Sequence, residues 1–527
     1  MKKYYLIILF LTLLALWPFF KKGFFESHDG EWMVIRFSAF HQTLTSGQFP
    51  VRFVDRLNNN YGYPVANFLY PLPFYLAEIP KILGFGFVDS IKIIFVLSTL
   101  ASTLVMFWAL SQIFDKWASL AGGILYLFSP YRFVDLYVRG SLGENLALAI
   151  VPLVFGSLLK IKKGDKRFLP IFSFSLALLI LAHNVIALLF LPLFLIVSMI
   201  VVNNRSKVLV SFGLGILISS FFWLPAIYDL QFVRLSQIKV SQIDDHLVPI
   251  TNLFSPSWGY GPTPDGNNHL STQIGIISSL VAASTIYLIF KGKIKETLVI
   301  FLLLTFTLSL FLMTKWSFLI WKTVPGLDII QFPWRLLSLI VFISSFLLAF
   351  LISISKRKIL IASTVVVASI ISTILYTKPL NFIDRREGFY ATNEATTTVR
   401  DEYLPLWVKE RPTARANQKI EINNGSIISS DIKPTNYKAK IQLDQDMDVT
   451  VNTIYFPTFK VTIDGEKANF SYNPPKGLIN FQLPKGEHEV IISYARSPIH
   501  LTSELISLAA IGITGTFFLT LWRKQSS

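Results

Sequence analysis

Residues 335–358, RLLSLIVFISSFLLAFLISISKRK, form a long apolar run with an arginine before it and basic residues at its end. A helix needs roughly 20 apolar residues to cross the hydrocarbon core of a bilayer. Basic residues in short loops gather on the cytoplasmic side of such helices. The stretch therefore predicts a membrane-spanning helix whose C-terminal end faces the cytoplasm.

Similar apolar runs recur along the chain and predict a polytopic α-helical membrane protein with about twelve spans. They lie near residues 4–20, 90–113, 117–130, 144–159, 168–182, 184–202, 207–225, 271–290, 297–313, 335–354, 358–376 and 503–522. If the N-terminus is placed inside, every inner segment is basic, from MKK at residue 1 to the RKQSS tail. We therefore expect both termini on the cytoplasmic side.

The composition excludes several classes of protein and of site. The 527 residues are 52% hydrophobic and only 15% charged, outside the usual range of soluble domains. The net charge of +16 sits largely in loops between apolar runs, so it serves topology and gives no support for nucleic-acid binding. With no cysteine in the chain, disulfides, zinc–thiolate sites and thiol nucleophiles are excluded.

The predicted topology divides the chain into three parts. Residues 1–376 form a transmembrane domain with a first outer loop at 21–89. Residues 377–502 alternate apolar and polar residues, with turn signals at Asp464-Gly465 and Lys485-Gly486, which predicts an extracytoplasmic β-rich domain like a sandwich or jelly roll. Residues 503–527 supply the last span and a cytoplasmic tail.

The first outer loop begins with KKGFFESHDGEW, residues 21–32, which concentrates Glu26, His28, Asp29 and Glu31. An amphipathic helix follows, with apolar residues spaced by three and four from Met33. One interpretation is structural: with Ser27 as N-cap, the acids occupy the first turn and stabilise the helix dipole. The other is chemical: an ionised carboxylate there binds a metal or accepts a proton. Sequence alone leaves both open.

Three other outer positions carry candidate residues. The stretch SPYRFVDLYVRGSLGENLALAIVPL at 129–153 contains Arg132, Asp135, Arg139 and Glu144. The spacing of Ser141 and Glu144 also fits a capping box, and Arg139 could simply extend to the interface. Arg335 lies at the outer end of its span, where an interfacial anchor is an equally simple interpretation. His183 and Asn184 lie in a tight outer turn, where histidine is usually structural.

Several motifs together resemble a bacterial membrane-protein family described as "6-pyruvoyl-tetrahydropterin synthase-related". They are GQFPVRF at 47, YGYPVANFLYPLPFYL at 61, the 129–153 stretch, LAHN at 181, FPWRLL at 332 and EYLPLW at 402. The layout also resembles the class C integral-membrane glycosyltransferases, which use polyprenyl-phosphate sugars at the outer leaflet and have an acidic motif in the first outer loop. The chain has no Asp-Asp or Asp-x-Asp pair at the matching position.

The resemblance implies an inverting glycosyltransferase of the bacterial cytoplasmic membrane. Its donor would be a polyprenyl-phosphate monosaccharide, and its acceptor a cell-envelope glycan, glycolipid or protein. Asp29 is the best candidate for the catalytic base, with Glu26 or Glu31 as helpers, and His28 would orient Asp29 or join a metal site. A divalent metal (Mg²⁺ or Mn²⁺) on Asp29 and Glu26 is left open. The implied roles are catalytic for Glu26, His28, Asp29 and Glu31, donor-phosphate binding for Arg132, Arg139 and Arg335, and supporting for Glu144, His183 and Asn184.

Two other functions remain open on the sequence. A transporter or flippase of a lipid-linked glycan would fit twelve spans, but the ionisable residues gather in outer loops and not at mid-span, where a transport path needs them. A non-catalytic envelope-assembly protein would tolerate a charge-neutral change at Asp29 and would depend on the β-rich domain for partner binding.

Overall fold

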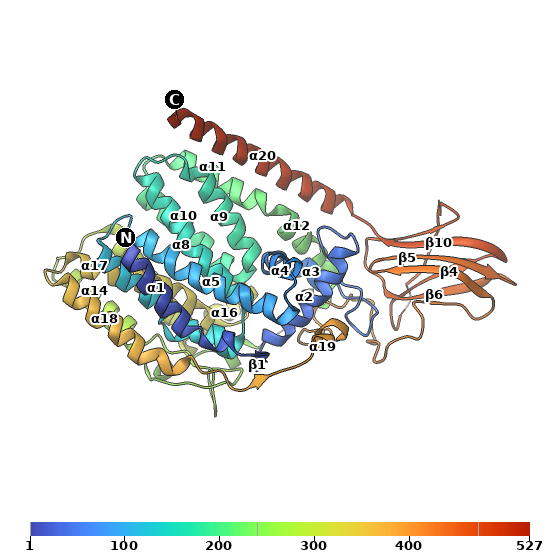
Figure 1. Cartoon of the computed structure of the whole chain (residues 1–527), viewed down its shortest axis with the longest axis horizontal. Coiled ribbons are helices and arrows are strands. Elements are labelled where there is room, and N and C mark those ends of the chain that lie inside the picture. The colour runs from blue at the N-terminus through green and yellow to red at the C-terminus, as the bar shows by residue number, and fades with distance from the viewer. Residues whose placement is uncertain (1, 240, 473, 527) are drawn as a thin grey trace.

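The computed structural model describes residues 2–239, 241–472 and 474–526, which form a helical body with a β-sheet region at one end. Figure 1 shows both chain termini at the far side of the body from the β-sheet region. The helical part and the C-terminal antiparallel sheets confirm the predicted order of the two regions.

Twenty α-helices are described. Their bounds are α1 Lys2–Ala15, α2 Gly30–Thr45, α3 Val65–Phe68, α4 Leu72–Ile82, α5 Phe87–Leu110, α6 Lys116–Leu127, α7 Pro130–Phe133, α8 Leu142–Lys162, α9 Phe168–Ala182, α10 Asn184–Val201, α11 Arg205–Ile218, α12 Ser220–Asp229, α13 Ile250–Phe254, α14 Ile276–Phe290, α15 Thr297–Met313, α16 Phe318–Thr323, α17 Leu337–Ile354, α18 Lys358–Thr373, α19 Glu387–Thr392 and α20 Pro498–Ser526. A π-helical turn, Val134–Arg139, precedes α8.

The chain is a multi-pass membrane protein, but the predicted count of about twelve spans is not confirmed. Within the described residues, six helices are long and apolar enough to cross a bilayer, or up to seven if α11 and α12, bent by 62°, count as one broken span. Helices α9, α14 and α15 are apolar but shorter. The apolar run at 117–130 becomes α6, whose 12 residues rise only about 18 Å, less than the ~30 Å hydrocarbon core.

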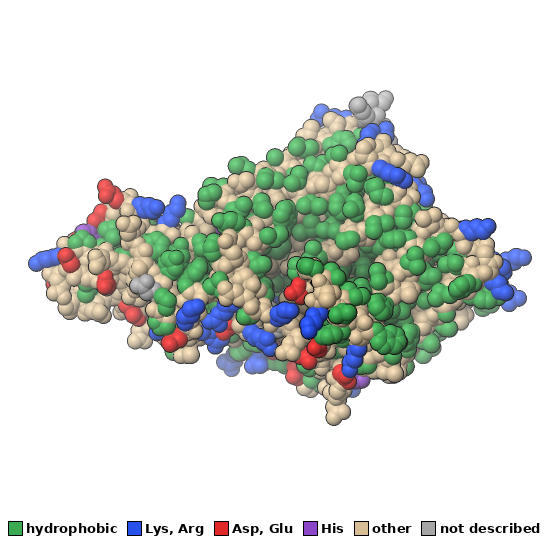
Figure 2. Space-filling view, turned by 180° about the vertical axis from the view of Figure 1, so that it is seen from behind, with side chains coloured by type: hydrophobic (Ala, Val, Ile, Leu, Met, Phe, Trp, Pro, Cys, Tyr) green, Lys and Arg blue, Asp and Glu red, His purple; other side chains and the backbone are tan. Residues whose placement is uncertain are grey.

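Helix α8 is the central element of the helical body. Within its apolar window, 94% of the residues are buried, and it packs against α5, α9 and α10. By contrast, only 17% of the corresponding window is buried in α18 and in α20, so both helices lie at the rim. Figure 2 shows a broad apolar surface over the body, with charged side chains at its edges and on the β-sheet region. Residues at the start of α8 are therefore shielded from solvent on most sides.

The β-sheet region consists of two antiparallel sheets around one apolar cluster. The sheet orders are β4-β5-β10-β7-β8 and β3-β6-β9. Inward-facing residues from both sheets, such as Ile441, Val451 and Val490, are completely buried in this cluster. The strand bounds are β3 Ile420–Glu421, β4 Ser426–Lys433, β5 Asn436–Leu443, β6 Met447–Ile454, β7 Phe459–Ile463, β8 Glu466–Lys467, β9 Leu478–Leu483 and β10 Gly486–Tyr494. The predicted turn signal Asp464-Gly465 lies between β7 and β8, and Lys485 lies between β9 and β10, with Gly486 as the first residue of β10.

The first outer loop binds the β-sheet region to the helical body. Strand β1, Phe24–Phe25, pairs antiparallel with β2, Phe382–Ile383. Farther along the loop, the buried Asp55 carboxylate accepts hydrogen bonds from Lys419 Nζ at 2.8 Å and from the Tyr437 hydroxyl. Because these contacts join residues more than 350 positions apart, the loop and the sheets form one packed unit.

Replacement of Lys419 should destabilise this junction. In Lys419→Met the Asp55 carboxylate stays buried without its cation, which typically costs about 3–5 kcal/mol. We expect a lower thermal unfolding temperature in detergent and faster proteolysis between the helical body and the sheets. Lys440→Met is the matched control, because Lys440 and Glu487 form an exposed pair on the same sheet region, worth about 0–1 kcal/mol. Equal effects of the two changes would contradict the assignment.

Candidate functional site

Three of the four candidate residues in the first loop already have partners. Glu26 accepts a hydrogen bond from the Asn381 side chain at 3.0 Å. His28 Nε2 donates to the Tyr260 carbonyl at 3.0 Å. Glu31 accepts from Arg385 and from the Tyr390 hydroxyl, each at 3.0 Å. The acidic cluster of the sequence is therefore divided among three different contacts.

Asp29 is different from its neighbours. It occupies the N-cap position of α2, but its side chain makes no capping hydrogen bond. Within the described residues its carboxylate has no hydrogen-bond or ion-pair partner, and the residue is partly exposed. The prediction of Ser27 as N-cap is wrong, although the Ser27 hydroxyl still accepts from the Gly30 amide at 3.2 Å. The amphipathic helix that follows is confirmed as α2, Gly30–Thr45.

Backbone contacts with the second loop hold Asp29 in place. The amide of Asp29 donates to the Arg139 carbonyl at 2.8 Å, and the amide of His28 donates to Val138 at 3.0 Å. The crossing is close at Gly140, whose φ is 63°, because an added Cβ would lie 2.6 Å from Ser27 Oγ. Glycine is thus required there by both conformation and space.

Arg139 is buried in a charged network at the start of α8. Its guanidinium donates to Asp135 at 2.7 Å and to Glu144, and it lies 4.7 Å from the Trp334 ring centroid. Glu144 also accepts from the Tyr131 hydroxyl at 2.5 Å. The capping-box interpretation of Glu144 is wrong, because Ser141 makes no side-chain cap and the carboxylate is used by these partners instead. Arg139 therefore has two carboxylate partners.

Arg335 lies beside this network with a different set of partners. Its guanidinium donates to the Ile330 carbonyl at 2.9 Å and to the Gln331 side-chain oxygen at 3.1 Å, both neutral groups. Its Nε is buried without a hydrogen-bond partner in the described chain. The charge of Arg335 interacts with those of Asp29, Arg139 and Glu144. The charges of these four residues thus form one interacting group in the structure.

The His183–Asn184 turn lies next to this group. The His183 ring stacks on Tyr70 with centroids 4.7 Å apart, and its Nδ1 accepts from the Ile186 amide at 3.2 Å. His183 also interacts electrostatically with Arg335 and Glu144. The exposed Asn184 caps only its neighbour's amide, Val185, at 3.0 Å. His183 is therefore a helix cap whose charge also interacts with this group.

Arg132 has hydrogen-bond partners that differ from those of Arg139 and Arg335. It is completely buried, and its guanidinium donates to Ser102 and Asn145, each at 3.1 Å. These partners belong to α5 and α8, so Arg132 joins two helices in the interior. The role of Arg132 in phosphate binding, which the resemblance implied, stays a prediction.

Two charged residues that sequence reasoning missed also belong to the site. Arg36, on α2, donates to Thr397 Oγ1 at 2.9 Å and interacts electrostatically with Tyr70 and Glu402. Glu402 has one carboxylate oxygen buried without a partner among the described residues. Burial raises the Glu402 pKa to about 7, against the opposing charge of Arg36. The motif EYLPLW contains Glu402, but the sequence gives no sign of a role in the site. The position of Glu402 near the first loop in the structure is what indicates that role.

A metal site is not supported by these side chains. Within the described residues, no three His, Asp or Glu side chains gather at a distance suited to one ion. Glu26 and His28 are each hydrogen-bonded to other residues, Asn381 and Tyr260. Among the first-loop candidates, this leaves Asp29 without a hydrogen-bond partner in the described chain. A divalent cation on Asp29 and Glu26 remains an untested prediction.

Comparison with known proteins assigns the chain to a family. Residues 67–380 match the profile described as "6-pyruvoyl-tetrahydropterin synthase related domain; membrane protein". The chain belongs to this membrane-protein family. The match includes the 129–153 stretch, the His183 turn and Arg335, but not Asp29 or Glu402.

One relative and two solved structures are similar to this family member. An uncharacterized protein of Lactococcus lactis subsp. cremoris (strain MG1363) is 28% identical over 246 residues, which is 44% of this chain and 40% of the relative. The chain therefore matches less than half of that relative's length. A cryo-EM structure of the arabinofuranosyltransferase AftD from Mycobacteria is 15% identical, with a TM-score of 0.49 over 74% of this chain and 28% of AftD. A structure of an AftD variant gives 13% identity and a TM-score of 0.47 over 73% and 29% of the two chains.

Glu402 should make stability depend on pH near neutrality. Its raised pKa means that the folded state holds the proton more tightly than the unfolded state does, so stability falls as pH rises from about 4.5 and levels off above about 7. We expect Glu402→Gln to remove this loss, on the order of 2–3 kcal/mol. Thermal unfolding in detergent between pH 5 and 8 measures it.

The exposed Glu410→Gln in the same segment is the control for this measurement. It should leave the pH dependence of the wild type unchanged. If wild type and Glu402→Gln lose stability equally across this pH range, burial does not hold the proton on Glu402.

Proposed function

We propose that the chain is an inverting glycosyltransferase of the bacterial cytoplasmic membrane. In this proposal a polyprenyl-phosphate monosaccharide is the donor, and a cell-envelope glycan, glycolipid or protein is the acceptor. The observation that carries it is the unpaired, partly exposed Asp29 carboxylate, whose charge interacts with that of Arg335, an arginine hydrogen-bonded only to neutral groups among the described residues. One group is suited to accept a proton and the other to hold a phosphate.

The acceptor side of the reaction needs a base. An acceptor hydroxyl becomes a better nucleophile when a positioned carboxylate takes its proton. Asp29 suits this role, because its backbone amide is hydrogen-bonded to the Arg139 carbonyl while its carboxylate has no hydrogen-bond partner in the described chain. Glu26, His28 and Glu31 are held by other partners and serve as positioning residues of the loop. Inversion follows if the hydroxyl attacks the anomeric carbon opposite the leaving phosphate.

The donor side needs positive charge where the leaving phosphate develops negative charge. Arg335 suits this role, because no carboxylate is bonded to it and its Nε has no partner in the described chain. Arg139 is already neutralised by Asp135 and Glu144, so we assign it to positioning Asp29. A phosphate could then accept charge-assisted hydrogen bonds from Arg335.

The proposed orientation places this site on the extracytoplasmic side. The site adjoins α2 and the β-sheet region, whereas both termini lie at the other end of the body (Figure 1). Loops such as 160–167 carry the basic residues, and basic loops favour the cytoplasmic side. A donor carried by a polyprenyl chain in the outer leaflet would then approach the site from the membrane.

Asp29→Asn should abolish sugar transfer. The amide keeps the size of the side chain but cannot take a proton, so we expect a rate loss on the order of 10²- to 10⁴-fold. Radiolabelled transfer in membranes supplied with a panel of polyprenyl-phosphate sugars measures this at matched expression. Glu26→Gln in the same loop is the control: the glutamine oxygen still accepts the hydrogen bond from Asn381, so the loop keeps its position and activity should be retained.

The outcomes of this assay separate the alternatives. Undiminished transfer by Asp29→Asn would move the base elsewhere. Transfer from no donor would favour the flippase or assembly functions. Addition of a chelator, with Mg²⁺ or Mn²⁺ restored, tests the predicted metal requirement in the same membranes.

Arg335→Ala should reduce transfer by roughly 10²- to 10³-fold, because loss of one preorganised electrostatic contact with a developing charge has that effect. Arg335→Lys should lie between wild type and alanine, since it keeps the charge but loses the planar fork. Arg400→Ala is the control, because Arg400, in the segment before β3, donates among the described residues to a backbone carbonyl, that of Lys239. An Arg335→Ala enzyme with normal transfer would overturn the phosphate assignment.

A further inference from the structure

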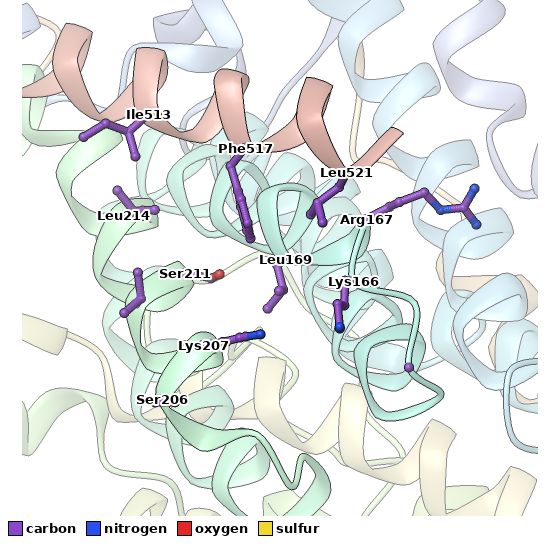
Figure 3. Close-up of a pocket in the computed structure, with 12 residues that line it drawn as sticks. Lys166, Arg167, Leu169, Ser206, Lys207, Ser211, Leu214, Ile513, Phe517 and Leu521 are labelled. Carbon is purple, nitrogen blue, oxygen red and sulfur yellow. The ribbon is translucent and has the colours of Figure 1, made fainter. Parts of the chain in front are cut away.

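A groove of about 790 Å³ lies at the end of the body that carries the C-terminus, far from the site described above. Its walls are the loop before α9 with the first turn of that helix, residues 206–214 of α11, and the C-terminal half of α20. Figure 3 shows α20 crossing above the groove, with the starts of α9 and α11 below it. It is therefore a gap between the last helix and the rest of the bundle.

The groove is apolar along α20 and basic at the opposite side. Leu214, Ile513, Phe517 and Leu521 line the apolar part. Lys166 and Lys207 border the opening, and Figure 3 shows their amino groups on either side of it. Neither ammonium group forms an ion pair with a described residue.

Other charges near the opening leave it positive. Arg167 is bonded to Asp165 through two hydrogen bonds of 2.8 Å, so these two charges cancel. The N-termini of α9 and α11 both meet the groove and add the positive ends of their helix dipoles. Two lysines and two helix ends thus present positive charge beside an apolar slot.

This combination of charge and apolar surface matches one kind of ligand. A phosphate without hydrocarbon would leave the slot along α20 unfilled, and a hydrocarbon without charge would leave the two lysines unpaired. A phospholipid has both parts in the order that the groove requires, with the headgroup at the membrane surface and the acyl chain towards its interior. Each basic residue near an anionic headgroup favours binding.

We propose that this groove binds an anionic phospholipid of the leaflet at that end, with its phosphate between Lys166 and Lys207 and an acyl chain along α20. The lipid would complete the packing of α20, whose apolar window is only 17% buried by protein. Helix α20 is bonded to the bundle near its start, where the Ser507 hydroxyl accepts from the Phe221 amide at 2.8 Å. The lipid would hold its other half. The inference does not depend on the proposed glycosyltransferase activity.

Native mass spectrometry of the full chain in detergent tests the proposal. Phosphatidylglycerol and phosphatidylcholine with identical acyl chains are the two probes, and retention of the anionic lipid in preference is the expected result. Lys166→Gln/Lys207→Gln should weaken phosphatidylglycerol binding by roughly tenfold or more. Lys293→Gln/Lys295→Gln is the control, because it removes the same two positive charges from exposed lysines between α14 and α15. It should bind phosphatidylglycerol as the wild type does.

A second pair of variants tests the apolar part without changing charge. Val210→Trp should fill the groove and displace the lipid, whereas Leu209→Trp, an exposed neighbour outside the lining, should not. Inorganic phosphate at matched concentration should not compete, because it lacks the acyl chain. Equal retention of the two lipids, unchanged binding by the double glutamine variant, or displacement by inorganic phosphate would each overturn the proposal.

Discussion

The buried charge of Arg139 is the constraint on which the candidate site depends. A guanidinium in a low-dielectric interior is stable only when it is paired and hydrogen-bonded. Asp135, one helical turn earlier, and Glu144, in the first turn of α8, meet this need together. Their positions hold the π-helical turn against the start of α8, and the Arg139 carbonyl then receives the Asp29 amide. The place of the first outer loop therefore follows from an ion-pair network inside the bundle.

The two arginines of the site differ in whether a carboxylate pairs with their charge, and this decides which of them can bind an anion. Arg139 has two carboxylate partners, whereas Arg335 has a backbone carbonyl and an amide oxygen. The charge of Arg335 therefore remains available to an anion. Removal of a partner from Arg139 would leave a buried charge and disturb the structure, so a variant at that position would report on folding as much as on chemistry.

The site is composite, and this explains why the β-sheet region belongs with it. Asp29 and Arg36 come from the first loop and α2, Arg335 from the start of a span, and Glu402 from the segment before the sheets. The buried Asp55–Lys419 pair joins the loop to the sheets. A displacement of the sheets would therefore move Glu402 relative to Asp29. The β-sheet region therefore helps to position Glu402 in the site.

The sequence by itself determined the membrane class, the α2 helix and the β-rich C-terminal region, because apolar length, helical spacing and strand alternation are local properties. It also brought Asp29, Arg139, Glu144 and Arg335 together as candidates. Only the structure shows where each helix begins and ends, and therefore which helices are long enough to cross a bilayer. Apolar composition does not mark these ends. The structure likewise decided that Glu144 pairs with Arg139 instead of capping, that Arg132 is interior, and that Glu402 joins the site. Those outcomes depend on contacts between residues distant in the chain, which no local pattern records.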